Sequence, residues 1–224
     1  MKKLGAVMNH SQLKALFDEK KEVLKENDKL RIHRTLSWFG RAEGASDDED
    51  AAFIFCWIAF NSIYAQEKDY SDISNEKASF GDFFEKVVGH DDANILYMAI
   101  WEKFSQSIRL LMNNQYVYQP FWHFQNGVEG YEDWENRFQK SIEMANRCLV
   151  SKDTKTMLSL VFDRLYVLRN QIMHGGATWN SRVNRQQIQD GHKILEFMLP
   201  KFIEIIINHP EEDWGKPIYP VVSS

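Results

Sequence analysis

Apolar residues recur every three or four positions along most of the chain, which is the spacing of one face of an α-helix. Glycine and proline are sparse, with 11 and 5 residues, so few signals interrupt this rhythm. The pattern predicts seven helices, over residues 11–39, 51–65, 80–88, 91–112, 131–149, 151–174 and 183–208. We expect a polar connection at 66–75 and an irregular tail from residue 209 onward.

The predicted helix over 51–65 is apolar nearly all round, which is typical of a helix buried at the centre of a fold. The acidic run 47–50 precedes it, and negative charge at a helix N-terminus suits the helix dipole. The chain contains neither an internal repeat nor a Ser/Gly linker. We therefore predict an all-α, single-domain helical bundle over 1–224, with its core at about 11–208 and a tail at 209–224.

Composition limits the possible partners. The chain has 224 residues, with 27 Lys and Arg against 32 Asp and Glu, so its formal net charge is −5. A nucleic-acid site would therefore have to be a local groove rather than a broad basic surface. The longest apolar run, 51–60, is too short for a membrane helix, and we expect a soluble cytoplasmic protein with no membrane partner. The two cysteines, Cys56 and Cys148, are predicted to be reduced core residues.

Several kinds of site are not indicated by the sequence. We find no Gly-rich phosphate loop and no serine nucleophile elbow. The seven histidines are not paired with each other or with cysteine, so neither a metal nor a cofactor is expected. The segment 113–129 is rich in aromatic residues, which either stack on nucleic-acid bases or, as is more usual, fill the edge of a core. These residues are Tyr116, Tyr118, Phe121, Trp122 and Phe124.

Residues 166–176 bring together side chains with chemical potential at the end of one predicted helix. Asn170 and His174 are four residues apart and share a face with Tyr166, while Arg169 lies one step around the helix. A cation and an imidazole at a helix C-terminus also suit the helix dipole, which is a purely structural role. However, a histidine can exchange protons near neutral pH and an arginine can hold a phosphate. The segment therefore also fits RNA cleavage without a metal.

These residues resemble the HEPN superfamily. The spacing from Arg169 to His174, with Asn170 after the arginine, is similar to the Arg-x4-6-His motif that lies late in those helical domains. The segments 38–43, 55–64 and 213–217 also resemble stand-alone bacterial HEPN proteins of the Apea-like kind. Gly176 stands where one branch has a tyrosine that a partner nucleotidyltransferase modifies, so that mode of control is not expected.

The resemblance implies a metal-independent endoribonuclease that acts in phage defence or as a toxin with an antitoxin protein. It also implies a homodimer in which two motifs face each other across a cleft that holds RNA. Arg169 and His174 would be the catalytic pair, supported by Asn170. The RNA 2′-OH would attack its own phosphate and leave a 2′,3′-cyclic end. Position along the chain, rather than the resemblance, adds further cleft candidates. Arg41 and Glu43 flank the end of the first predicted helix, Trp179 and Asn180 follow the glycines, and Tyr166 shares the face of Asn170 and His174.

Two alternatives stay open at this point. In the first, the same cleft belongs to a non-catalytic module that binds nucleotide, RNA or an antitoxin, which the acidic net charge favours. In the second, the protein is a structural interaction partner. A wide apolar stripe on the last helix fits that role, and dimer contacts between helices would explain it equally well. Its members are Ile188, Leu195, Met198, Phe202 and Ile205.

Overall fold

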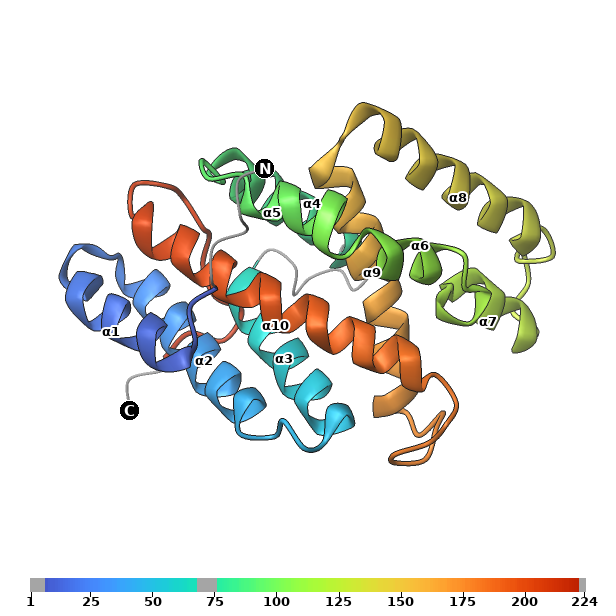
Figure 1. Cartoon of the computed structure of the whole chain (residues 1–224), viewed down its shortest axis with the longest axis horizontal. Coiled ribbons are helices and arrows are strands. Elements are labelled where there is room, and N and C mark those ends of the chain that lie inside the picture. The colour runs from blue at the N-terminus through green and yellow to red at the C-terminus, as the bar shows by residue number, and fades with distance from the viewer. Residues whose placement is uncertain (1–6, 68–75, 222–224) are drawn as a thin grey trace.

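A computed structural model describes residues 7–67 and 76–221, which form helices and no strand. The all-α prediction is therefore confirmed (Figure 1). The α-helices are α1 (His10–Lys20), α2 (Glu26–Glu43), α3 (Glu49–Tyr64), α4 (Glu76–Gly89), α5 (Ile95–Met98), α6 (Ser105–Met112), α7 (Gln119–Gln125), α8 (Trp134–Ser151), α9 (Thr154–Met173) and α10 (Arg185–Asn208). Single turns of other helix types are η1 (Lys21–Val23), η4 (Ala99–Lys103) and η5 (Gln115–Val117).

Helix α3 lies at the centre of the bundle, as predicted. It packs against α2, α10, α9 and α4, and most of its side chains are buried. Phe60 is fully buried, and its ring centroid lies 4.4 Å from that of Phe162 on α9. A Cβ at Gly191 of α10 would come within 3.0 Å of the Phe53 ring and within 2.9 Å of Leu165. Glycine at this position therefore permits the close approach of α10 to α3 and α9.

The apolar stripe on α10 is core rather than surface. All five of its members are at most 2% exposed within a single chain. They face the interior because α10 packs against α3, α2 and α1. The suggestion that this stripe makes contacts with a second copy or another protein is therefore wrong.

The single helix predicted over 11–39 is two helices. After η1, the backbone of Leu24 and Lys25 is extended, with ψ of 147° and 149°. The break lets α1 pack against both α2 and α10. Leu24 is buried at the break, which explains why the apolar rhythm continues through it.

The helix predicted over 91–112 starts later and is interrupted. The carboxylate of Asp91 accepts hydrogen bonds from the backbone N–H groups of Ile95 and Leu96 at 2.9 and 2.7 Å, which fixes the start at Ile95. The N–H of Phe104 donates to the carbonyl of Ala99 at 2.9 Å, a π-type bond that adds one residue to the turn. The aromatic-rich segment 113–129, for which no helix was predicted, contains η5 and α7. The connection predicted at 66–75 lies mostly outside the described residues.

Both cysteines are free and buried, as expected. Burial raises the pKa of the Cys56 thiol far above its ordinary value, so this side chain behaves as a small apolar residue. In the part of the chain that the structure describes, we find no helix with the length and apolar character needed to span a membrane.

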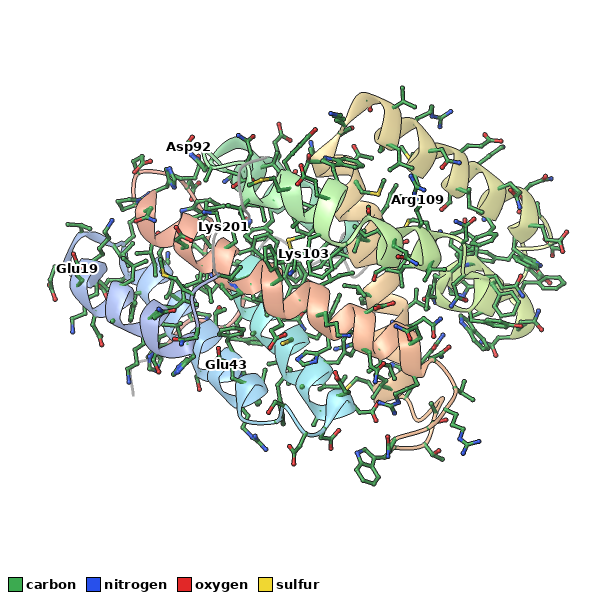
Figure 2. All side chains as sticks on the ribbon, in the orientation of Figure 1. Glu19, Glu43, Asp92, Lys103, Arg109 and Lys201 are labelled. Carbon is green, nitrogen blue, oxygen red and sulfur yellow. The ribbon has the colours of Figure 1, made fainter. Side chains whose placement is uncertain are left out.

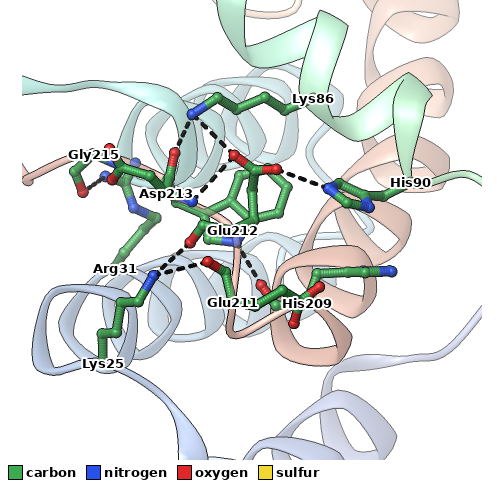
Figure 3. A network of polar contacts seen from close by, with 10 residues as sticks. Lys25, Arg31, Lys86, His90, His209, Glu211, Glu212, Asp213 and Gly215 are labelled. Atoms are coloured by element: carbon green, nitrogen blue, oxygen red, sulfur yellow. Dashed lines mark hydrogen bonds and ion pairs between the residues drawn. The ribbon is translucent and has the colours of Figure 1, made fainter.

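The tail after α10 is irregular over its described part, and basic side chains hold its main chain (Figure 3). The guanidinium of Arg31 is buried and donates to the carbonyls of Ile63 and Ala65 and, at 2.9 Å, to Gly215. Lys25 donates to the carbonyl of Glu212 at 2.8 Å, and Lys86 donates to that of Asp213. These contacts attach the tail to α2, α3 and α4.

We predict that Arg31→Met destabilises the fold by roughly 3 kcal/mol, because three carbonyl groups would lose the guanidinium that donates to them in a buried position. Equilibrium unfolding in urea measures this change. Arg34→Met is the matched control, since Arg34 donates to the carbonyl of Tyr219 in an exposed position and should cost less than about 1 kcal/mol. Equal losses for both variants would contradict the role given to Arg31.

Candidate functional site

The end of α9 is shaped by a Schellman motif. The N–H of Gly176 donates to the carbonyl of Gln171 at 2.7 Å, and the N–H of Gly175 donates to that of Ile172 at 3.2 Å. Gly175 has a φ of +70°, which a residue with a side chain rarely adopts. His174 is the C-cap residue, and its side chain is exposed. The local sequence therefore fixes where the helix ends and presents the imidazole at that point.

The structure brings two members of the predicted catalytic set to one cleft. Asn170 and His174 both line it, as their four-residue spacing predicts. Arg169 is not among the residues that line it. Instead, the Arg169 guanidinium donates to the Asn170 side-chain oxygen at 2.7 Å. Within a single chain, Arg169 therefore orients Asn170.

The cleft has a volume of about 850 Å³ and lies between the end of α9, α7 with the turn before it, and the segment before α10. Its lining carries no Lys, Arg, Asp or Glu side chain among the described residues. The lining residues are Tyr116, Gln119, Trp122, Asn126, Val167, Asn170, Gln171, His174, Gly176, Val183 and Asn184.

A chain of hydrogen bonds joins the three walls of the cleft. The Gln171 side-chain amide donates to the carbonyl of Tyr116, and Asn184 donates to the Gln171 side-chain oxygen at 2.7 Å. The Trp122 indole donates to the same Tyr116 carbonyl at 2.8 Å. The carbonyl of Tyr116 thus accepts hydrogen bonds from both α7 and α9. Gln171 of α9 in turn accepts one from Asn184 in the segment before α10.

A second set of contacts links α9 to α8 and to Tyr118, the residue before α7, through a buried cation. Arg164 of α9 is 2% exposed, and its guanidinium lies over the Tyr118 ring at 4.4 Å and near the Phe138 ring at 5.7 Å. Arg164 also donates to the Ser141 hydroxyl of α8. Tyr118 and Phe138 form a small separate core with Phe121 of α7. Two of the five aromatic residues at 113–129, Tyr118 and Phe121, therefore fill the edge of a core. Tyr116 and Trp122 line the cleft, and Phe124 is 42% exposed.

The loop after α9 is attached to the N-terminus of α3. One Asp50 carboxylate oxygen accepts from the backbone N–H of Asn180 and from the Arg185 guanidinium, both at 2.8 Å. Asp48 caps α3 and accepts from the Trp179 indole at 3.0 Å. The hydrogen bond from the N–H of Ala51 is the main cause of the lowered pKa of the Asp48 carboxyl. The acidic run therefore does more than begin a helix, because it also holds the loop that follows His174.

The other predicted cleft residues lie elsewhere. Trp179 and Asn180 belong to the loop just described and do not line the cleft. Tyr166 is half-buried and packs against Trp57, with ring centroids 6.2 Å apart. Arg41 lies over the Phe55 ring at 4.8 Å.

Glu43 belongs to a different part of the molecule. Its carboxylate accepts from the backbone N–H of His10 at 2.9 Å. It lines a separate cavity of about 380 Å³ with Lys103 and Lys193 (Figure 2 labels Glu43 and Lys103). The structure therefore does not bring Arg41 and Glu43 to the cleft at His174.

Nine of the eleven lining residues were not chosen from the sequence as site residues. Four of them form the hydrogen-bond chain described above, namely Tyr116, Trp122, Gln171 and Asn184. Tyr116 and Trp122 lie in the aromatic stretch that the sequence did single out. Gln171 lies inside the motif itself, but its role depends on Tyr116, which is 55 positions away. In the described residues, no three His, Cys, Asp or Glu side chains gather closely enough to hold a metal ion.

We predict that Asp50→Ala releases the loop at 177–184, because two donors lose their acceptor. The change should cost on the order of 2 kcal/mol of stability and speed hydrogen exchange at the Asn180 amide. Asp47→Ala is the control, since Asp47 is an exposed neighbour of the same charge. Unchanged exchange at Asn180 in Asp50→Ala would show that other contacts hold the loop.

Comparison with known proteins supplies no relative. No protein-family model, no curated protein and no solved structure matches the chain significantly. The function therefore has to be argued from the residues of the cleft and from the motif at the end of α9.

Proposed function

We propose that this protein is a metal-independent endoribonuclease of the HEPN type that acts as a homodimer. The observation that carries the proposal is the position of Asn170 and His174 on one cleft, with Arg169 bonded to Asn170. The cleft is wide enough for a nucleotide and is open to solvent on the side of the exposed His174 ring.

His174 fits the role of the general acid or base. Its ring makes no hydrogen bond to any described residue, so both nitrogens are available to a substrate. In the proposed reaction, the RNA 2′-OH loses its proton to a base and bonds to the adjacent phosphorus. The bond from phosphorus to the 5′-oxygen then breaks, and an acid protonates the leaving oxygen. Arg169 would stabilise the charge on the phosphate through its guanidinium.

A dimer follows from this chemistry. One chain offers one imidazole at the cleft, whereas the reaction uses a base and an acid. A two-fold pair of chains would supply two of each group, including a second Arg169. Large apolar side chains are exposed around the end of α9, and a second copy could cover them. They are Met173, Trp179 and Val183, which are 54%, 74% and 62% exposed.

A second candidate function is supported by the charge of the cleft. Its described lining carries no Lys or Arg, and the net charge of the chain is −5. An uncharged cleft attracts a polyanion weakly. A non-catalytic module that holds a nucleotide or a protein partner would therefore also fit this lining.

The cellular role rests on the resemblance to HEPN proteins. We propose a toxin or phage-defence effector in the cytoplasm, with RNA as its substrate and an antitoxin protein as a possible partner. The reaction as written uses the side chains of the protein and the 2′-OH of the substrate, so it requires no cofactor.

We predict that Arg169→Ala and His174→Ala each lower the rate of RNA cleavage by about 10²–10⁴-fold, because each removes a group that acts in the transition state. Asn170→Ala should lose less, because Asn170 supports rather than reacts. The melting temperature of each variant should change little, since a contact at a helix C-terminus is worth only about 0.3–1 kcal/mol. Cleavage of labelled RNA and thermal melts on the same preparations provide the test.

Two results would contradict the proposed chemistry. One is a destabilised His174→Ala protein that still cleaves RNA at the full rate, which would assign the residue a structural role. The other is activity that disappears in EDTA and returns with magnesium or manganese. Cleavage that persists in EDTA and is lost in both variants is the expected result.

We predict a dimer at micromolar concentration, which light scattering would detect as twice the mass of one chain. Trp179→Ser should weaken it, because this indole is the most exposed of the three apolar side chains. Val150→Ser is the control, since Val150 is 88% exposed but lies at the end of α8. A monomer that cleaves RNA would rule out a composite site.

A further inference from the structure

The described lining of the cleft at His174 is made of carboxamide, aromatic and small side chains. A second cleft of about 590 Å³ adjoins it and shares Tyr116 and Asn184 with it. That second cleft is also rich in amides, with Asn113, Asn114, Gln115, Gln186 and Gln187 in its lining and Asp190 as its charged member. A lining of this kind suits a flat, neutral ligand with hydrogen-bonding edges better than it suits a phosphate.

The orientation of the Asn170 amide follows from the chemistry of its partner. Arginine has donors and no acceptor, so the Asn170 atom bonded to Arg169 is the oxygen. The nitrogen Nδ2 is therefore the free end of the amide, and it makes no hydrogen bond within the described residues. Asn170 thus offers the cleft a donor whose identity is fixed by Arg169.

The orientation of the Asn184 amide follows in the same way through two steps. The carbonyl of Tyr116 only accepts, so the Gln171 atom bonded to it is the nitrogen. The Gln171 oxygen is then the acceptor for Asn184, which must donate through its own nitrogen at 2.7 Å. The oxygen Oδ1 of Asn184 is left over and has no donor within the described residues. Asn184 thus offers the cleft an acceptor.

Two aromatic rings stand beside these amides. Trp122 is half-buried, and its indole N–H is bonded to the carbonyl of Tyr116, which holds the ring in place. Tyr116 is 51% exposed, although it is anchored through its main chain by two donors. A fixed indole face and an exposed phenol ring, next to an oriented donor and an oriented acceptor, are the kinds of groups that recognise an unstacked nucleic-acid base.

We propose that this cleft binds the base of an unpaired nucleotide. The base stacks on Trp122 or Tyr116, and its polar edge meets Nδ2 of Asn170 and Oδ1 of Asn184. The inference rests on the proposed function in taking RNA as the source of that base. It makes single-stranded RNA the substrate class, because the edge of a paired base is already occupied by its partner.

The test measures the binding of free nucleosides to the full chain. Calorimetry and the shifts of amide resonances report the binding. Adenosine, guanosine, uridine and cytidine are compared with ribose 5-phosphate and inorganic phosphate. At least one nucleoside should bind more tightly than either phosphate compound, because the cleft contributes a base site rather than an anion site. RNA cleavage should be faster on single strands than on a duplex of the same sequence.

Two variants identify the groups that bind. Trp122→Ala should raise the nucleoside Kd about fivefold or more, which is the lower end for loss of a base-stacking ring. Asn170→Asp keeps an oxygen for Arg169 but replaces the free donor with an acceptor, and it should raise the Kd about tenfold. Trp38→Ala is the control, because Trp38 is partly exposed on α2 and stacks on Phe55 away from the cleft. It should leave the Kd unchanged.

The outcomes separate this inference from the proposed function. If nucleosides bind no better than ribose 5-phosphate, or if both cleft variants bind like the native protein, the base site is overturned. His174-dependent cleavage that persists in that case leaves the ribonuclease intact. Conversely, nucleoside binding that both variants weaken, in a protein that cleaves no RNA, supports the base site and overturns the ribonuclease.

Discussion

Helix α3 is apolar on nearly every face, and this constraint determines the arrangement of the other helices. A helix of this kind is stable only when neighbours cover it all round, and α2, α10, α9 and α4 do so. The absence of a side chain at Gly191 brings α10 close enough to complete the cover. Because α9 must turn its Leu165 face toward this core, its Asn170 and His174 face is left at the edge of the bundle. The position of the cleft is thus a consequence of the burial of α3.

Periodicity predicted the existence of most helices but not two of their interruptions. The apolar rhythm runs through the break at Leu24 because that side chain is buried in the extended backbone just as it would be in a helix. It also runs through η4, where one wider turn shifts the register without exposing Phe104. Periodicity indicates that a helix face is buried but does not identify what buries it. The stripe on α10 therefore also fitted contact with a partner, although the core of the chain itself buries it.

The same distinction applies to the site. The shared face of Asn170 and His174, and the end of α9 at glycine, depend on neighbours in sequence and were predictable. The contact of Gln171 with Tyr116 and that of Asn180 with Asp50 join segments 55 and 130 positions apart, and helical spacing carries no signal for them. Arg41 and Glu43 were placed near the site on the argument that they flank a helix end. That end faces Phe55 and His10 instead.

The tail after α10 is held mainly through its main chain. Carbonyl oxygens between residues 211 and 219 accept hydrogen bonds from four basic side chains. These are Arg31 and Arg34 of α2, Lys25 just before it, and Lys86 of α4. A carbonyl has the same chemistry in every residue, so these cations specify the path of the tail and not its composition. Evolution can therefore replace most exposed side chains of this segment freely, whereas inserting or deleting a single residue would move the carbonyls that follow it away from their cations. Divergent homologues should accordingly preserve the length of this segment better than its sequence, apart from the buried Trp214 and the glycine beside it.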